Sequence, residues 1–445
     1  MNVLLVNPHI YDFAAYGFWS SPLGLLYLGG ILRKNGMNLR LIDCMVTLDV
    51  KRKPDGRAPF LKKNDPRPLP APLAGIRKRL KRYGMSDARL REALLSADPP
   101  DLVLITSIMT YWYPGTREAA SLIREAFPAA KIVVGGIYPS LCADHAFANL
   151  RDAHLVLNHT QVDRLYAYIE ESLSFPLSFK PSPYDLDTLP YPAFDLYESI
   201  PFVPLLTSYG CSFACAYCAT PYMHPAIVRR NPAHVVSEIR HWQALGVKNF
   251  AIYDDNFLHR AEIYAKPMLT QIASLADPMD IYNPNAVNAA LITEELAELL
   301  KASGFREVRL GLETVNPELQ HATGAKVNSR VFERAVAALF KAGFPPGSIA
   351  AYIMAGLPLQ PWEDVQRAID YLADLGVRTH IAEYTPIPHT PLFDRYHHLA
   401  RYPITDDPLY QNNALFPFAW EGFTEEDLER LKRSARDKNA LLVDK

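Results

Sequence analysis

The sequence has few cysteines and no long apolar run, and both shortages restrict the class of protein. Only five cysteines occur in 445 residues, and three of them fall between residues 211 and 218, so a secreted disulfide framework is not expected. The longest apolar run, residues 23–32, contains three glycines and is too short to cross a bilayer. No basic leader precedes it. We therefore expect a cytoplasmic protein without a membrane span.

Net charge is also small, because 46 basic and 48 acidic side chains leave −2, which does not by itself indicate a polyanionic partner. One local imbalance lies between Lys51 and Arg82, where twelve basic residues and six prolines stand beside Asp55 and Asp65. We interpret residues 51–86 as a basic, proline-rich insertion that extends from the fold as a solvated loop. The alternative is a surface for an anionic substrate or a nucleic acid, whose binding would weaken steeply with salt.

The first 175 residues alternate short apolar runs with segments of helical periodicity, which predicts an α/β domain with a doubly wound, Rossmann-like parallel sheet. The expected strands are residues 2–6, 39–43, 101–106, 131–135 and 154–157, and the expected helices are residues 22–35, 87–96, 115–126, 139–149 and 161–172. Ligands bind at the carboxyl edge of such a sheet. The candidate ligand-binding residues on the loops at that edge are Asn7, His9, Ser107, Thr110, Gly135, Gly136 and Tyr138.

A second series of strands and helices follows a proline-rich linker, residues 176–201. Its expected strands are residues 203–209, 249–253, 280–283, 307–312, 349–355 and 380–384. Six such units predict a partial (β/α)6 barrel over residues 202–395, with a short, mainly helical tail over residues 396–445. The active site of such a barrel lies at the carboxyl ends of its strands.

Three cysteines, Cys211, Cys215 and Cys218, lie on one loop directly after the first expected barrel strand. Thiolates bind zinc, copper(I) and iron–sulfur clusters. Because no fourth cysteine is near, a cluster held by these three would keep one iron open for chemistry. The alternative is a structural zinc site completed by His224.

Polar residues recur at the carboxyl ends of the other barrel strands. Each alone is an ordinary turn or capping residue, but five consecutive strand ends carry them: residues 254–256, 283–285, 311–314, 355–358 and 386–390. This recurrence indicates a bound polar ligand.

The spacing Cys-x3-Cys-x2-Cys, with Tyr217 before the last cysteine, resembles the signature of the radical S-adenosylmethionine (radical SAM) enzymes. Together with the N-terminal domain, which begins Asn7-Pro-His9 and continues with residues 21–32, the chain looks like the cobalamin (B12)-binding-domain radical SAM enzymes. This resemblance implies a [4Fe–4S] cluster on the three cysteines, S-adenosylmethionine at the open iron, and cobalamin on the N-terminal domain. It places Asp254 and Asp255 near the methionine amino group, Glu313 near the ribose or methionine, and Tyr217, Gly356 and Leu357 along the adenine. A neighbouring basic pair, Arg229 and Arg230, matches many relatives without an evident role.

The sequence departs from many cobalamin proteins, because it lacks Asp-x-His-x-x-Gly after the first strand. Its nearest match, residues 152–157, ends in leucine. We therefore expect cobalamin without a histidine on its lower face, and a vestigial domain is the alternative.

The resemblance implies a cobalamin-dependent methyltransferase that acts on an unactivated carbon of a small molecule or peptide, with a flavodoxin or ferredoxin as electron donor. Hydrogen abstraction or rearrangement, nucleic-acid modification, and a zinc-loop binding protein without activity are the alternatives.

Overall fold

The computed structural model describes residues 1–46, 51–59, 62–324 and 326–443. It divides into two compact units, residues 1–200 with 402–415 and residues 201–401 with 416–445. Residues 60–61 of the expected insertion and 444–445 of the expected tail lie outside the described residues. The expected tail is divided between the units, because residues 402–415 belong to the first unit and residues 416–445 to the second. No described helix combines the length and the apolar character needed to traverse a membrane.

The first unit contains a parallel five-stranded sheet whose strand order is β3-β1-β6-β7-β8. Its strands are β1 (Asn2–Asn7), β3 (Asn38–Asp43), β6 (Leu102–Ser107), β7 (Lys131–Gly136) and β8 (Leu155–Val156). The order reverses between β1 and β6, so the loops after these two strands diverge and leave room for a ligand. The predicted doubly wound sheet is confirmed.

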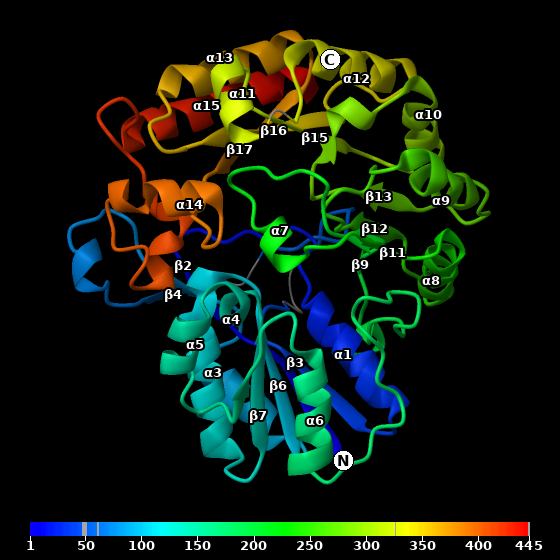
Figure 1. Ribbon diagram of the computed structural model, residues 1–445, viewed down its shortest axis with the longest axis vertical. Coiled ribbons are helices and arrows are strands. Elements are labelled where there is room, and N and C mark those ends of the chain that lie inside the picture. Colours follow the sequence, from blue (N-terminus) through cyan, green and yellow to red (C-terminus); the bar gives the residue numbers. More distant parts are fainter. Residues whose placement is uncertain (47–50, 60–61, 325, 444–445) are drawn as a thin grey trace. The chain divides into compact units, whose positions relative to one another are not determined.

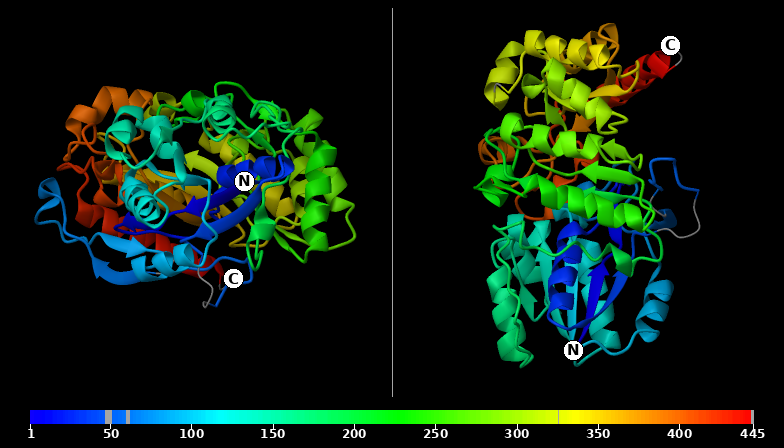
Figure 2. Two further views of the ribbon diagram at one scale, coloured as in Figure 1. Left: turned by 90° about the horizontal axis from the view of Figure 1, so that it is seen from below. Right: turned by 90° about the vertical axis from the view of Figure 1, so that its right-hand side faces the viewer.

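Helices cover both faces of this sheet (Figures 1 and 2). They are α1 (Leu23–Lys34), α2 (Asp87–Leu95), α3 (Tyr113–Ala126), α4 (Ile137–Leu141), α5 (Ala143–Asn149) and α6 (Val162–Ser172). Alternate β1 residues pack into two separate cores. Leu4 belongs to the core under α2 and α3, and Leu5 to the core under α1 and α6. This alternation follows from the two-residue period of a strand.

The basic insertion departs from the expected extended loop. Strands β4 (Lys62–Pro66) and β5 (Lys81–Tyr83) form a small antiparallel sheet with β2 (Ile10–Asp12). Arg82 is only 2% exposed and pairs with Glu118 at 3.4 Å, while Arg67 donates to the hydroxyl of Tyr11 at 2.7 Å. Part of the positive charge is therefore neutralised inside the first unit, which the sequence pattern did not predict.

Residues 402–415 complete the first unit from the far end of the chain. Asn412 donates to the buried carboxylate of Asp12 at 2.9 Å, and Asp407 accepts from the hydroxyl of Tyr113 at 3.0 Å. Leu409 joins the core beside α3. This segment therefore supplies both polar partners and apolar surface to the first unit.

The second unit is the predicted partial barrel. Its strands are β9 (Val203–Leu205), β12 (Asn249–Ile252), β13 (Asp280–Tyr282), β14 (Val287–Asn288), β15 (Val308–Glu313), β16 (Ile349–Ala355) and β17 (Arg378–Glu383). They form two parallel sheets, β13-β12-β9 and β14-β15-β16-β17. The expected strand at 280–283 corresponds to β13, and the short strand β14 was not expected. Two further short strands, β10 (Ser208–Tyr209) and β11 (Val228–Arg229), pair antiparallel.

Two of the helices between these strands begin at residue types that favour the N-cap position. Asn231 caps α8 (Pro232–Ala244) and Thr293 caps α10 (Glu294–Ala302), each accepting a hydrogen bond from a first-turn N–H. The remaining helices are α7 (Thr220–Met223), α9 (Ala265–Ala273), α11 (Pro317–Thr323), α12 (Ser329–Lys341), α13 (Trp362–Asp374), α14 (Pro391–Tyr396) and α15 (Glu425–Val443).

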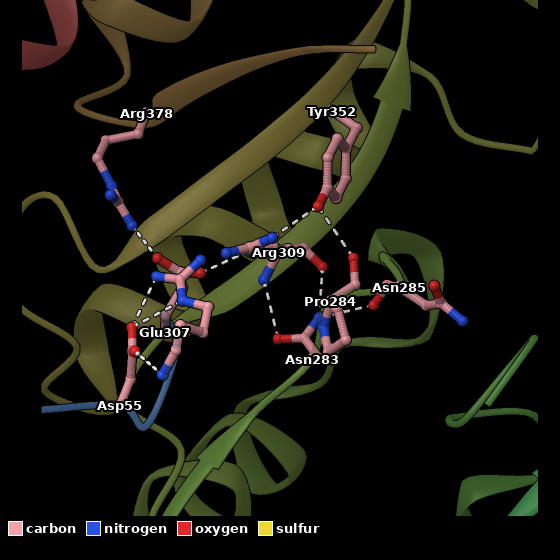
Figure 3. A network of polar contacts seen from close by, with 9 residues as sticks. Asp55, Asn283, Pro284, Asn285, Glu307, Arg309, Tyr352 and Arg378 are labelled. Atoms are coloured by element: carbon pink, nitrogen blue, oxygen red, sulfur yellow. Dashed lines mark hydrogen bonds and ion pairs between the residues drawn. The ribbon is translucent and has the colours of Figure 1, made fainter. Parts of the chain in front are cut away.

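Polar side chains help to join the two half-sheets of the barrel (Figure 3). The Asn283 amide donates to the carbonyl of Arg309 at 2.9 Å and accepts from its N–H at 3.1 Å, so it replaces one rung of a strand ladder. The side chain of Arg309 is 3% exposed and donates to the hydroxyl of Tyr352 at 2.7 Å. Tyr352 donates in turn to the carbonyl of Pro284 at 2.9 Å. These polar contacts extend the backbone bonds that Ile281 makes across the same seam to Gly304 and Arg306.

We expect Asn283→Ala to lower the free energy of unfolding by about 2–4 kcal/mol, because the buried N–H and carbonyl of Arg309 lose their partners. Denaturant unfolding measures the change. The matched control is Gln243→Ala, which removes a solvent-exposed bond to the carbonyl of Asp277 and should cost less than about 0.5 kcal/mol. Equal effects of the two substitutions would contradict the role given to Asn283.

Candidate functional site

The three cysteines lie on a loop whose base is closed by a short ladder. Ser208 pairs with Arg229 and Tyr209 with Val228. The loop of residues 210–227 therefore begins and ends at the same pair of strands. Gly210 begins the loop with φ +86°, and a Cβ there would meet the carbonyl of Ala226 at 2.4 Å. Glycine is therefore required for this close approach.

The thiols sit near one another and near N–H groups. Cys211 accepts from the N–H of Phe213 and Cys218 from the N–H of Thr220, both at 3.5 Å. Burial raises the pKa of Cys211 and Cys215, and the charge of Cys218 raises both further. No set of three His, Cys, Asp or Glu side chains among the described residues is drawn together as a single metal ion requires. A four-iron cluster fits a wider spacing, because each thiolate binds a different iron.

Two carboxylates after β12 hold the chain that leads into this loop. Asp254 is 3% exposed and accepts from the N–H and hydroxyl of Thr207 at 2.7 and 2.5 Å and from the hydroxyl of Ser208 at 2.7 Å. Burial raises its pKa to about 6. Asp255 accepts from the N–H of Gly210 at 2.7 Å. Contact with a methionine amino group remains a prediction for both, and their observed partners give them a positioning role.

Glu313 ends β15 beside the cysteine loop. Its φ of +67° is unusual for a residue with a side chain, and the pairing of β15 with β16 shifts register between Gly311 and Glu313. Burial raises the pKa of Glu313, while Lys326 and the hydroxyl of Tyr217 lower it. The same hydroxyl bonds to Cys215. Tyr217 thus links the carboxylate to a predicted cluster ligand.

Lys326 is a site residue that the sequence patterns did not indicate. A Cβ on Gly311 would lie 3.0 Å from Oε1 of Glu313 and 3.1 Å from Nζ of Lys326, so both charged groups converge over that glycine. A cavity of about 390 Å³ opens beside Lys326, a volume suited to a small molecule. It is lined by Ala290, Pro317, Gln320, His321, Lys326, Val327, Asn328 and Val331.

Two asparagines near strand ends carry a buried amide NH2 group that has no hydrogen-bond partner among the described residues. Asn256 is 7% exposed and Asn288 is 1% exposed, and Nδ2 of each is unsatisfied. Asn288 pairs with Gly311 in the ladder and so shares its face. A buried donor left unpaired costs roughly 1–3 kcal/mol, a cost that a polar ligand would remove.

Gly356 and Leu357, expected along an adenine, are held by Gln360. Both N–H groups donate to its Oε1, at 2.9 and 3.2 Å. Gly356 has φ +86°, and a Cβ there would lie 2.4 Å from the ring of Phe416. Because both N–H groups are already bonded, these two residues can offer a ligand only apolar contacts in this conformation.

At the carboxyl edge of the first unit, a small cavity lies where the strand order reverses. Asn7 and Ser107 line it, together with Pro8, Ile10, Ser20, Met45, Ile108, Trp112 and Thr116. Asn7 donates to Asp43 at 2.8 Å, and Oγ of Ser107 is buried without a partner in the described part of the chain. Gly136 has φ +109°, and a Cβ there would meet the carbonyl of Ser107 at 2.5 Å.

The other residues expected at that edge point into the first unit. His9 is fully buried, with Nε2 at 3.2 Å from Glu118, and burial lowers its pKa. Tyr138 is fully buried and its hydroxyl contacts His145 at 2.7 Å. Thr110 is 6% exposed, and Gly135 precedes Gly136 at the end of β7. A corrin would therefore meet backbone and apolar surface here, with no histidine offered by His9.

Comparison with known proteins gives a family match and several distant relatives. Residues 205–388 match the model of the Radical SAM superfamily. The chain is 24% identical to the bacteriochlorophyllide d C-12(1)-methyltransferase of Chlorobaculum tepidum, over 59% of each protein. It is 23% identical to the cytidylyl-2-hydroxyethylphosphonate methyltransferase of Streptomyces wedmorensis, over 80% of this chain and 73% of that protein. The chain thus spans less than two thirds of the first relative.

Two solved structures share the fold. The radical SAM methyltransferase TsrM from Kitasatospora setae, with cobalamin and a [4Fe–4S] cluster bound, superposes with a TM-score of 0.64 and 19% identity, over 89% of this chain and 78% of that chain. The cobalamin-dependent radical SAM enzyme OxsB superposes with a TM-score of 0.57 and 13% identity, over 98% of this chain and 61% of that chain.

Proposed function

Because this chain belongs to the radical SAM superfamily through residues 205–388, we propose that it is a cobalamin-dependent radical SAM methyltransferase. The observation that carries the proposal is the convergence of Cys211, Cys215 and Cys218 with Glu313 and Lys326 at the carboxyl ends of barrel strands. Structural relatives with the same two-part fold bind a cluster and cobalamin.

The cysteines would hold the [4Fe–4S] cluster, which supplies one-electron cleavage of S-adenosylmethionine. Asp255 orders the entry to the cysteine loop through Gly210, and Ala216 donates to the carbonyl of Thr323 at 3.2 Å. These two contacts fix the loop from both sides. A fixed loop places the open position of the cluster where a cosubstrate can be oriented before it reacts.

Lys326 and Glu313 form a pair of opposite charges beside that position. S-adenosylmethionine carries both a carboxylate and ammonium and sulfonium groups, so each member of the pair has a complementary partner on the cosubstrate. The unsatisfied amide of Asn288, on the strand next to Gly311, adds a hydrogen-bond donor. Together these groups would orient the cosubstrate and exclude water.

Cobalamin would bind at the carboxyl edge of the first unit, around the cavity lined by Asn7 and Ser107. The exposed backbone near Gly136 permits the close approach of a flat ligand. Because His9 is fully buried and its Nε2 contacts Glu118, we do not assign its ring as a lower ligand. Cobalamin in this site supplies the methyl group for transfer to an unactivated carbon of a small molecule or peptide.

The decisive experiment is expression with cobalamin uptake, anaerobic purification and reconstitution with iron and sulfide. We expect about one corrinoid and four irons per chain, and reductant-dependent consumption of S-adenosylmethionine. A corrinoid-free protein that still forms 5′-deoxyadenosine would refute the methyltransferase proposal and leave the first unit as a vestigial domain. A protein that binds zinc without sulfide would refute the radical SAM function itself.

A further inference from the structure

Three basic side chains gather at the base of the cysteine loop. Arg229 ends β11, and its guanidinium contacts Nδ1 of His259. Arg260 follows His259 and is exposed, with φ +53°. Burial and the charge of Arg260 lower the pKa of Arg229, and burial with the charges of both arginines lowers the pKa of His259. We call Arg229, His259 and Arg260 the cationic cluster.

No acidic side chain in the described part of the chain forms an ion pair with the cationic cluster. The guanidinium of Arg229 instead lies 5.7 Å from the ring centre of Tyr264. The neighbouring Arg230 shows the contrast, since it pairs with the buried carboxylate of Glu238. Arg229 and Arg260 repel each other, and the charge of Asp254, which acts on Arg229 without an ion pair, opposes this repulsion from the protein's side. An anionic partner from outside would reduce the repulsion further.

The position of the cationic cluster identifies the kind of partner. Ser208 and Arg229 are paired strand residues, whose Cα atoms lie about 5 Å apart. Cys211 is three residues from Ser208, at most about 10 Å of chain. Arg229 is therefore within about 15 Å of the first predicted cluster ligand. Pro225 and Ala226, immediately before β11, are exposed and add a small apolar surface beside the charges.

We infer that the cationic cluster docks an acidic electron-transfer protein that carries a flavin or an iron–sulfur centre. The inference rests on the proposed function, because a cluster that cleaves S-adenosylmethionine must first receive one electron. The reduced donor loses that electron and the cluster gains it, with no bond made or broken. Weak, charge-steered contacts suit such a short-lived complex, since complementary charge raises the rate of encounter.

The test uses the reconstituted full-length protein with flavodoxin as the probe. Affinity is measured by titration at about 50 and 200 mM salt, and 5′-deoxyadenosine formation is measured with either reduced flavodoxin or dithionite. The variants are Arg260→Glu and Arg229→Gln. The matched control is Lys248→Glu, since Lys248 is exposed and precedes β12 at the opposite end of the strand from Arg260. Iron content and thermal unfolding verify that each variant is intact.

We expect Arg260→Glu to weaken flavodoxin binding about tenfold at low salt and to slow the flavodoxin-supported rate similarly, with the dithionite-supported rate unchanged. Arg229→Gln should have a smaller effect in the same direction, and Lys248→Glu should change each quantity less than twofold. Unchanged flavodoxin affinity in Arg260→Glu would overturn the inference, and so would a change confined to RNA binding. Absence of 5′-deoxyadenosine with dithionite in the parent protein would refute the proposed function instead, while the affinity comparison still decides the docking surface.

Discussion

Replacement of Cys211, Cys215 and Cys218 by alanine should abolish iron and sulfide retention and all 5′-deoxyadenosine formation. The three residues are the only cysteines on the loop between β10 and β11, and thiolates are the ligands that an iron–sulfur cluster requires. Reconstitution under anaerobic conditions, followed by iron and sulfide analysis, measures the result.

The matched control is Cys142→Ala. Cys142 belongs to the first unit, where its sulfur lies 3.9 Å from Gln411, and burial raises its pKa to about 12. Cys142 lies outside the loop between β10 and β11 that carries the three predicted ligands, so this variant should keep its full iron content. Iron retained by the triple variant would show that the ligands lie elsewhere in the chain.

Substitution of Glu313 by glutamine should weaken S-adenosylmethionine binding by about tenfold to a hundredfold and leave the iron content unchanged. The change removes a charge while keeping the shape, and a hydrogen bond to a charged group contributes about 1.5–3 kcal/mol. The substitution also removes the negative charge beside Lys326. We expect this loss to affect binding of the cosubstrate more than folding. Equilibrium titration of the reconstituted protein with S-adenosylmethionine measures the effect.

Glu318→Gln provides the control for this substitution. Glu318 is exposed in the first turn of α11, only five residues along the chain, and its loss should not alter affinity. If Glu313→Gln bound the cosubstrate as tightly as the parent protein, the carboxylate would have a purely structural role through Tyr217.

The strands were predictable from sequence because both faces of a parallel sheet are buried and its strands are read as apolar runs. The expected strand at 349–355 coincides with β16, and the expected strand at 131–135 is one residue shorter than β7. The starts of α8 and α10 are also marked in the sequence, because Asn231 and Thr293 are residue types that favour the N-cap position. The cysteine loop was found by spacing alone.

The direction of polar side chains was not predictable, because it depends on contacts between residues distant in the chain. His9 was expected at a ligand edge, yet Glu118 on α3 draws its ring inward. Lys326 belongs to no recognisable motif. It lies near the site because α11, which precedes it, packs on the cysteine loop through Thr323. The short strand β14 was not predicted either, and neither was the bond by which the side chain of Asn283 replaces a backbone rung.

The return of residues 402–415 to the first unit has a consequence for synthesis on the ribosome. Asp12 would be buried without its Asn412 partner, and the core around α3 would lack Leu409, until more than four hundred residues had been made. Domains usually fold as units, the N-terminal one first, as the chain emerges. Here the first unit would wait in an incomplete form while the barrel is being translated. Expression of residues 1–200 alone should accordingly yield a less stable protein than the same residues supplied with a 402–415 peptide.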